Sequence, residues 1–153
     1  NPTAVKQYMD NKIEVEYYPM GSLIEKIRCA AAGLGGVLTP TGLGTLLEKG
    51  KKKIEVDGRE YLLETPLKAD VAIIKAQKAD KMGNLVYSGA PTASPLMAAA
   101  ADITIVEVEE IVEAGEIKPE MVQTPGVFND AICVGYSYEE CQSKMRKVWS
   151  RLQ

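Results

Sequence analysis

The sequence predicts an α/β fold with an open, mainly parallel sheet flanked by helices. Residues 70–76 and 103–108 are short, continuous apolar runs, a pattern typical of strands buried on both faces of a parallel sheet. Between them, the four alanines of residues 98–101 suit a helix that packs closely on a sheet. The chain has 153 residues, of which 46% are apolar, so it is long enough for one domain of this kind.

The first third of the chain is predicted to contain a helix, a strand and a capped helix. Residues 1–11 have a mildly helical pattern, and residues 13–17 alternate apolar and polar side chains like a strand. Ser22 and Glu25 have the spacing of a capping box, which predicts that a helix begins there. Gly33 suits the position just after the last turn of this helix. Its predicted apolar face consists of Leu23, Ile24, Ile27 and Ala31.

The middle of the chain predicts a hairpin, a strand and a helix. Two strands within residues 54–63 are joined by Asp57-Gly58, a pair suited to a type I′ turn. Residues 84–87 read as another short strand. Ser94 followed by Pro95 has the order of an N-cap and a first helical residue, which predicts a helix through the alanine run.

The last third predicts short elements and a terminal helix. Residues 111–115 indicate a short helix stopped by glycine, residues 119–122 a helical turn, and residues 127–134 a last strand. Ser137 and Glu140 repeat the capping-box spacing and open a terminal helix that we expect to dock onto the domain or a partner. Its predicted apolar face is Tyr138, Cys141, Met145, Val148 and Leu152, with Trp149 at its border.

Composition excludes several functional classes. The net charge of −3 gives no reason to expect nucleic acid or a membrane surface as a partner, and no apolar run reaches the roughly 18 residues of a membrane span. The chain has no histidine, which removes Ser-His-Asp and Cys-His catalysis and histidine-ligated metals. No signal peptide is recognised, and the odd, scattered set of Cys29, Cys133 and Cys141 predicts reduced thiols and a cytoplasmic location.

The chain is organised around the glycine-rich stretch at residues 29–45, which follows a predicted helix end. Phosphate loops and dinucleotide fingerprints instead follow a strand, so those two functions are not supported. From spacing alone, the stretch either lines a ligand or forms a tight turn. The lysines of residues 49–53 either hold a phosphate-bearing ligand or form a solvated turn, with the solvated turn favoured. The carboxylates of residues 107–116 are predicted to be a solvated surface, and Asp102 a cap or turn residue.

A longer pattern runs through the same region. The segment Pro19-x-Gly-Ser-Leu-Ile-Glu-Lys-Ile-Arg28 is followed by Ala32-Gly-Leu-Gly-Gly-Val-Leu-Thr-Pro-Thr-Gly-Leu-Gly-Thr45. Further motifs follow in the same order within residues 61–64, 67–76, 79–84, 100–107 and 124–127. Over residues 1–134 the sequence resembles the α subunit of class I CoA-transferases, the acetate/acetoacetate, butyrate–acetoacetate and 3-oxoacid types.

This resemblance implies an enzyme that moves coenzyme A between two carboxylic acids through a glutamyl-CoA thioester. The nucleophilic glutamate is expected on a partner β subunit, in a heterodimer or heterotetramer, so no catalytic residue is expected in this chain. The resemblance implies coenzyme A and acyl-CoA as substrates, with no permanently bound cofactor and no metal. It also implies that the α subunit lines the acyl pocket and part of the oxyanion hole, at Met20, Gly21, Gly33, Gly35, Gly36, Thr39 and Thr41.

Three departures from the family pattern accompany the resemblance. Met20 stands where many members have glutamine, whose amide can donate to the thioester oxygen, and a thioether cannot donate. Residues 91–94 read Pro-Thr-Ala-Ser in place of Arg-Asn-Phe-Asn, which suggests an altered substrate pocket. The N-terminal portion of the family domain is expected to be missing, so residues 1–136 would form the C-terminal part of that domain and residues 137–153 its terminal helix.

Two alternatives remain open at this stage. The first is a non-catalytic, ligand-binding relative that kept the fold, supported by Met20 and the altered residues 91–94. The second is an enzyme related to sugar-phosphate isomerases on a similar open sheet. The absence of histidine and of a recognisable acid–base pair makes the isomerase the weaker of the two.

Overall fold

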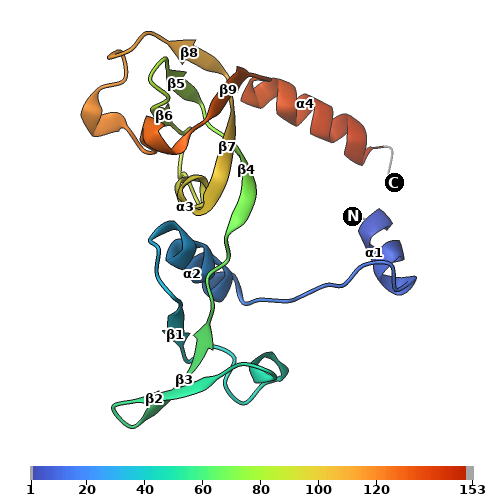
Figure 1. Ribbon diagram of the computed structural model, residues 1–153. Coiled ribbons are helices and arrows are strands. Elements are labelled where there is room, and N and C mark those ends of the chain that lie inside the picture. The colour runs from blue at the N-terminus through green and yellow to red at the C-terminus, as the bar shows by residue number, and fades with distance from the viewer. Residues whose placement is uncertain (1, 151–153) are drawn as a thin grey trace.

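A three-stranded parallel sheet forms the centre of the molecule. The structure, a computed structural model, describes residues 2–150. Strands β4 (Ala69–Lys75), β7 (Ala101–Val108) and β9 (Ala131–Val134) lie side by side in the order β4-β7-β9. Helix α3 (Ser94–Ala100) packs on β4 and β7 and lies between them in the chain (Figure 1). This arrangement confirms the predicted α/β class and its parallel strands.

Only one face of this sheet is covered within residues 2–150, which corrects the prediction of strands buried on both faces. Ala72, Ile74, Thr104 and Val106 are buried on the α3 side. The alternate residues point the other way, as the pleat of a strand requires, and no described element covers them. The side chains on this open face are Val71, Ile73, Ile103 and Ile105, which are 47%, 73%, 49% and 37% exposed.

A second sheet extends the core beyond the carboxyl ends of β4 and β7. It consists of β6 (Leu85–Val86), β5 (Lys78–Asp80) and β8 (Glu110–Val112) in that order, with β5 parallel to β8. The predicted strand at residues 84–87 is thereby confirmed. The predicted helix at residues 111–115 is wrong, because these residues begin inside β8 and pair with β5. The main apolar cluster spans both sheets and α3: Ile74, Ala76, Ala79, Leu85, Tyr87, Ala98, Val106 and Val108.

A third sheet lies at the opposite end of the molecule. It contains β1 (Val37–Thr39), β3 (Arg59–Glu64) and β2 (Lys53–Val56), all antiparallel. The predicted hairpin is confirmed: Asp57 and Gly58 both have positive φ, 50° and 72°, as a type I′ turn requires. Between β1 and β2, residues Leu46–Glu48 form a short 3₁₀ helix.

Helix α2 (Met20–Ala31) joins the two ends by packing against α3 and β1. It begins at Met20 rather than Ser22, and its N-cap, Pro19, makes no side-chain bond, so the predicted first capping box is wrong. The Ser22 hydroxyl is instead buried without a partner, and Glu25 pairs with Arg28 at 2.6 Å.

The predicted end of α2 is confirmed, but its predicted buried face is wrong. Ser22, Lys26 and Cys29 are the buried residues, rather than the predicted leucine and isoleucine face. Leu23, Ile24, Ile27 and Ala31 of that predicted face are only partly buried. Gly33 ends the helix with φ of 66°, as predicted, and the Leu34 N–H donates to the Cys29 carbonyl at 2.8 Å.

Several shorter predictions also need correction. Residues 14–19 form an extended segment without strand partners, so the predicted strand at 13–17 is absent. Ser94 is the first helical residue of α3, with Ala93 as the N-cap. Asp102 lies within β7 rather than in a cap or turn. Residues 119–121 and 126–128 are 3₁₀ turns, so only Ala131–Val134 of the predicted last strand is strand.

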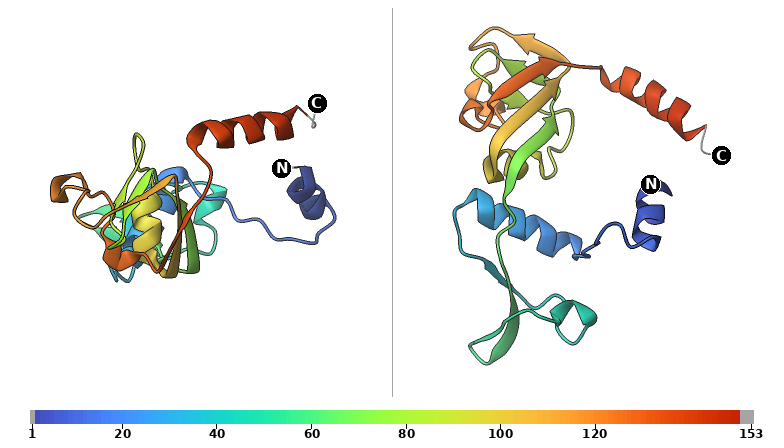
Figure 2. Two further views of the ribbon diagram at one scale, coloured as in Figure 1. Left: turned by 90° about the horizontal axis from the view of Figure 1, so that it is seen from above. Right: turned by 45° about the vertical axis from the view of Figure 1, so that its right-hand side comes forward.

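Two helices lie apart from the packed body. Helix α1 (Pro2–Met9) follows the predicted helical pattern, and α4 (Tyr138–Trp149) opens with the predicted capping box between Ser137 and Glu140. Both project to the same side, and the last turn of α4 lies near α1 in these views (Figures 1 and 2). Neither helix has a fully buried residue. In the apolar face predicted for α4, Cys141 is partly buried and Tyr138, Met145 and Val148 are exposed, while Leu152 lies outside the described residues.

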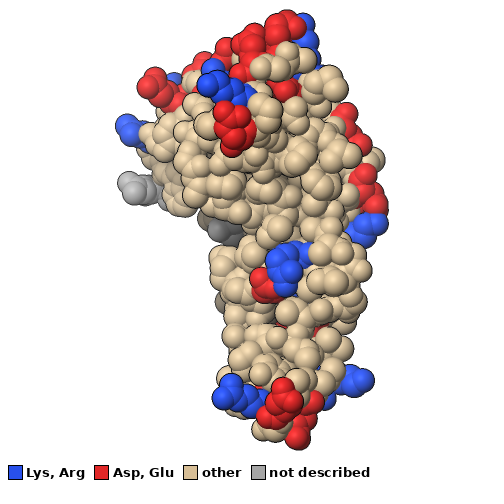
Figure 3. Space-filling model, turned by 90° about the vertical axis from the view of Figure 1, so that its left-hand side faces the viewer, with Lys and Arg blue, Asp and Glu red and all other residues tan. Residues whose placement is uncertain are grey.

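Charged side chains are spread unevenly over the face that Figure 3 shows. Acidic and basic residues are mixed at its top and bottom, a further mixed group lies near the middle and others lie along the right-hand edge, with wide uncharged areas between them. Among the described residues, no helix is long and apolar enough to cross a membrane.

Candidate functional site

A surface hollow of about 490 Å³ opens at the N-terminus of α2. The first turn of the helix forms one wall, and the end of β1 with the following residues forms the other. The hollow is lined by Pro19, Met20, Gly21, Ser22, Ile24, Glu25, Thr39 and Thr41. Two segments that are about twenty residues apart in the chain therefore meet here, because α2 packs against β1.

The first turn of α2 presents free backbone donors to this hollow. The first helical bond runs from the Leu23 N–H to the Pro19 carbonyl at 3.0 Å. Within residues 2–150, the N–H groups of Met20, Gly21 and Ser22 have no hydrogen-bond acceptor, and no side chain caps the helix. Unpaired N–H groups at the positive end of a helix dipole attract negative charge. The arrangement can therefore stabilise an anion or a developing oxyanion.

The structure divides the predicted site residues into two groups. Met20, Gly21, Thr39 and Thr41 line the hollow, and the Met20 side chain is 73% exposed at its edge. Gly33, Gly35 and Gly36 follow the opposite end of the twelve-residue α2. Gly36 has a packing reason of its own, because a Cβ there would lie 2.7 Å from the Glu64 carbonyl oxygen.

A buried charge cluster lies on the flank of the same helix. Lys26 on α2 is 5% exposed and Glu64 on β3 is 2% exposed, with 3.5 Å between their charged atoms. Lys51 contacts the other oxygen of Glu64. The ring of Tyr18 lies 4.9 Å from the Lys26 ammonium and 5.3 Å from the Lys51 ammonium. These residues, with Gly50, Lys52, Leu63 and Thr65, line a hollow of about 330 Å³.

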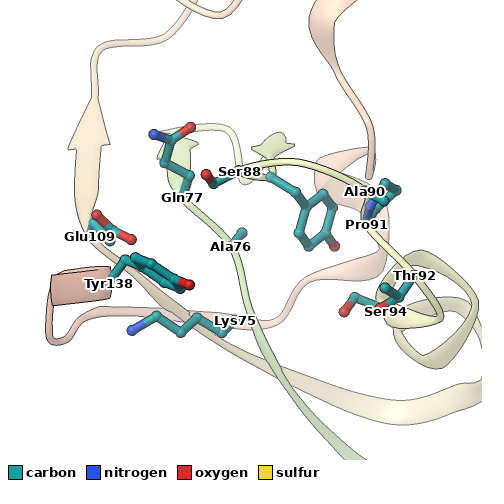
Figure 4. Close-up of a pocket in the computed structure, with 11 residues that line it drawn as sticks. Lys75, Ala76, Gln77, Ser88, Ala90, Pro91, Thr92, Ser94, Glu109 and Tyr138 are labelled. Atoms are coloured by element: carbon teal, nitrogen blue, oxygen red, sulfur yellow. The ribbon is translucent and has the colours of Figure 1, made fainter. Parts of the chain in front are cut away.

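A third hollow, of about 230 Å³, lies at the carboxyl end of β4 (Figure 4). Lys75, Glu109 and Tyr138 stand on one side of it, and Pro91, Thr92 and Ser94 on the other. The sequence segment that departs from the family pattern at residues 91–94 therefore lies in a different hollow from Met20. Thr92 has φ of 52°, a conformation that is strained for a β-branched residue.

Lys75 fastens the start of α4 to the sheet. Its ammonium donates to Glu107 at 2.7 Å, to the Tyr136 carbonyl at 2.5 Å and to the Cys141 sulfur at 3.2 Å. Burial alone would lower the pKa of Lys75, but the bonds to Glu107 and Cys141 outweigh it and raise that pKa. The predicted solvated acidic surface also proves to be a row of ion pairs: Lys75–Glu107, Lys78–Glu110 and Lys81–Glu113.

The side chains that could ligate a metal are scattered within residues 2–150. No three histidine, cysteine, aspartate or glutamate side chains in this part of the chain come together as a metal-binding group. All three cysteines are free, with Cys29 buried, Cys133 exposed and Cys141 partly buried.

The comparisons with known proteins decide the family. Residues 1–135 match the sequence profile of the coenzyme A transferase family. The chain belongs to this family. It is 49% identical over 135 residues to the acetate CoA-transferase subunit alpha of Escherichia coli K12, covering 88% of this chain and 61% of that protein. It is 52% identical over 129 residues to the acetoacetyl-CoA:acetate/butyrate CoA transferase alpha subunit of Clostridium acetobutylicum, covering 84% and 59%.

A solved structure gives the same answer for the fold of this coenzyme A transferase chain. An acyl-CoA transferase from Escherichia coli O157:H7, in a thioester complex with CoA, matches with a TM-score of 0.81 and 26% identity. The match covers 88% of this chain and 30% of that one. The chain spans about 60% of the length of the two curated relatives, and residues 136–153, including α4, lie beyond the family profile.

Sequence reasoning missed the buried charge cluster. Lys26 follows Ser22 by four residues, which places both on one helix face, but a lysine among apolar neighbours reads as solvated. For Lys51 and its neighbours the sequence leaves a phosphate-bearing ligand and a solvated turn open and favours the solvated turn, and it gives no partner for Glu64. The helical spacing of Ser22, Lys26 and Cys29 is the signal for the buried face of the helix.

Proposed function

We propose that this chain is part of a CoA-transferase α subunit, which moves coenzyme A between carboxylic acids, of the short-chain acyl-CoA and acetate or acetoacetate type. The observation that carries the proposal is the uncapped N-terminus of α2, with three free N–H groups beside a hollow, in a chain of this family. A thioester that is attacked by a carboxylate develops negative charge on its carbonyl oxygen. Donors that are fixed before the reaction lower the free energy of that state.

The role proposed for this chain is to bind and polarise the thioester. The N–H groups of Gly21 and its neighbours would donate to the carbonyl oxygen, while Thr39 and Thr41 line the acyl pocket. Met20 lies at the rim, where its thioether supplies apolar contact and no donor. Backbone donors would therefore replace the side-chain amide that many family members use.

The nucleophile is proposed to be a glutamate of a β subunit. Its carboxylate attacks the thioester carbonyl, the carbon–sulfur bond breaks, and coenzyme A leaves as a thiolate. The thiolate then attacks the glutamyl carbonyl, which releases the first acid and leaves coenzyme A on the glutamate. A second carboxylic acid reverses both steps and takes the coenzyme A away.

The remaining proposals concern assembly and organisation. We place residues 1–136 in the C-terminal part of the family domain and residues 137–153 in its terminal helix. We propose that the chain assembles with the β subunit into a heterodimer or heterotetramer. This complex is proposed to work in the cytoplasm and to hold no permanently bound cofactor. Gly33, Gly35 and Gly36 stay as proposed pocket residues, although they lie far along α2 from Met20.

The test is a covalent trap of the complex. The chain is incubated with a matching β subunit and acyl-CoA, then treated with borohydride or hydroxylamine, and both chains are analysed by mass spectrometry. We expect the modification on a β-subunit glutamate and none on this chain. Full activity after replacement of that glutamate by glutamine would overturn the proposed mechanism.

The non-catalytic alternative has less support, because the relatives that are about half identical to this chain over the aligned residues are named as transferase subunits. The same incubation separates the two functions. A ligand-binding relative would bind acyl-CoA without exchanging its coenzyme A with labelled carboxylic acid.

A further inference from the structure

We propose that the hollow beside Lys26 binds a compact oxyanion, a carboxylate or phosphate group, through the ammonium groups of Lys26, Lys51 and Lys52. This site is separate from the hollow at the N-terminus of α2, and it involves none of the residues proposed to polarise the thioester. It also stands without the transfer reaction, since it rests on charge and burial alone.

The charges that line this hollow do not balance. Three lysines face a single carboxylate, that of Glu64. Lys51 takes one oxygen of Glu64 in a close contact, and the other oxygen is 3.5 Å from Lys26. Lys52 lies at the exposed rim and has no ion-pair partner among residues 2–150. The net positive charge of this hollow therefore attracts an anion.

Lys26 is a buried cation with few hydrogen bonds. Its ammonium carries three N–H donors, and its side chain is only 7% exposed. Among the described residues its one acceptor is Glu64, at 3.5 Å, the outer limit of a hydrogen bond. The Tyr18 ring, 4.9 Å from the ammonium, attracts the charge but accepts no conventional hydrogen bond. A buried cation with so few bonds is costly unless a ligand completes them.

The opposing interpretation is that Lys26 ties α2 to β3. A tie of this kind would use a short, well-aligned bond, and Glu64 already has its close partner in Lys51. If Lys26 only served the fold, its removal would leave Glu64 less well paired and destabilise the chain. If Lys26 serves a ligand, an apolar replacement of similar length would leave the empty protein at least as stable. The two interpretations therefore predict opposite changes.

The first experiment measures binding of inorganic phosphate to the full chain. The variants are Lys26→Met and Lys52→Met, with Lys49→Met as the control, because Lys49 carries the same charge in the same segment outside the hollow. Isothermal titration is carried out against sodium chloride of matched ionic strength. We expect Lys26→Met to weaken phosphate binding about tenfold or more, the effect of losing one charge-assisted hydrogen bond. Lys52→Met should weaken it less, and Lys49→Met should bind like the wild type.

Thermal unfolding of the same proteins gives the second readout. We expect phosphate to raise the unfolding temperature of the wild type and not of Lys26→Met. Without phosphate, Lys26→Met should unfold at the same or a higher temperature than the wild type. Two results would overturn the proposal. The first is equal phosphate binding by the wild type and Lys26→Met. The second is a lower unfolding temperature for Lys26→Met together with no effect of phosphate on the unfolding temperature of the wild type.

Competition against bound phosphate identifies the source of the anion. Displacement by coenzyme A but not by pantetheine, which lacks the phosphates, assigns the site to the coenzyme. Displacement by a dicarboxylic acid of four to six carbons but not by acetate assigns it to the far carboxylate of an acyl substrate. Because no measurement requires turnover, this site can fail while the proposed transferase function holds, and the reverse is also true.

Discussion

Asp80 and Asn84 are joined by three hydrogen bonds across the turn between β5 and β6, one of them from the Asp80 backbone N–H to the Asn84 carbonyl oxygen at 3.0 Å. The Asn84 side-chain amide donates to Asp80 Oδ2, and the Asn84 backbone N–H donates to Oδ1, both at 2.9 Å. The Met82 backbone N–H also donates to Asp80 Oδ1, at 2.9 Å. The side-chain oxygen of Asn84 accepts from the Gly126 backbone N–H at 3.0 Å. The buried Asp80 carboxylate thus orders the turn, and the Asn84 side chain links the turn to the loop before β9.

These bonds make the stability contributed by Asp80 dependent on pH. Burial alone would raise the pKa of Asp80, but the donors from Asn84, Met82 and Gly83 outweigh it and lower the pKa below its ordinary 3.8. A lowered folded pKa stabilises the fold above the unfolded pKa, and this contribution is lost as the pH falls through the folded pKa. We expect Asp80→Asn to cost about 1–3 kcal/mol at pH 7, with a smaller difference from wild type at pH 3.

Urea unfolding at pH 7, 5 and 3 checks this prediction. Asp70→Asn is the matched control, because Asp70 is exposed on β4 and should change stability little at any of the three values. A difference between Asp80→Asn and wild type that stays constant from pH 7 to pH 3 would contradict the proposed charge effect.

The attachment of α4 should depend on Lys75 more than on Lys78 or Lys81, the other two lysines in the row of ion pairs. The Lys75 ammonium binds Glu107, the Tyr136 carbonyl and Cys141, whereas Lys78 and Lys81 pair with one glutamate each. We expect Lys75→Met to speed amide hydrogen exchange at residues 136–141 while leaving the β4–β7 core unchanged. Lys78→Met is the control and should leave exchange at residues 136–141 as in the wild type, since exposed pairs contribute little.

Gly126 should tolerate no side chain. A Cβ at this position would lie 2.0 Å from the Met82 carbonyl oxygen, which is backbone and cannot move without disturbing the Asp80 turn. We therefore expect Gly126→Ala to destabilise the chain by about 3 kcal/mol or more, within the range of severe packing errors. Gly35→Ala is the control, because no atom lies within 4 Å of its Cβ position and its φ is not positive. Similar unfolding midpoints for the two variants would refute this account of Gly126.

Local signals predicted the elements whose conformation is set by neighbouring residues. The Asp57-Gly58 turn, the end of α2 at Gly33 and the capping box at Ser137 all form as expected, because each depends on a few adjacent residues. The parallel pair β4 and β7 was also predicted, since long apolar runs separated by a helix leave few alternatives.

Long-range contacts decided the elements that were predicted wrongly. Ser22 and Glu25 have capping-box spacing, yet α2 begins two residues earlier at Met20 and buries Ser22 against its neighbours. Residues 111–115 have a pattern that fits a short helix, but Ile111 and Val112 pair with β5 as part of a strand. The charge cluster of Lys26 and Glu64 joins residues 38 positions apart, a pairing that no local pattern contains.

Met20 gives the sharpest test of the hollow at the N-terminus of α2. A glutamine at this position would add an amide donor beside the free N–H groups of the first turn, at an exposed site that needs no repacking. We expect Met20→Gln, in complex with the β subunit, to change the ratio of kcat/KM values over a series of short-chain acids by about tenfold or more, because a donor to the oxyanion is worth a few kcal/mol. Met82→Gln is the control, since Met82 is also exposed, at 69%, and lies outside this hollow. An unchanged profile for Met20→Gln, with folding and assembly intact, would remove Met20 from the acyl pocket and leave the backbone N–H groups of α2 as the proposed donors.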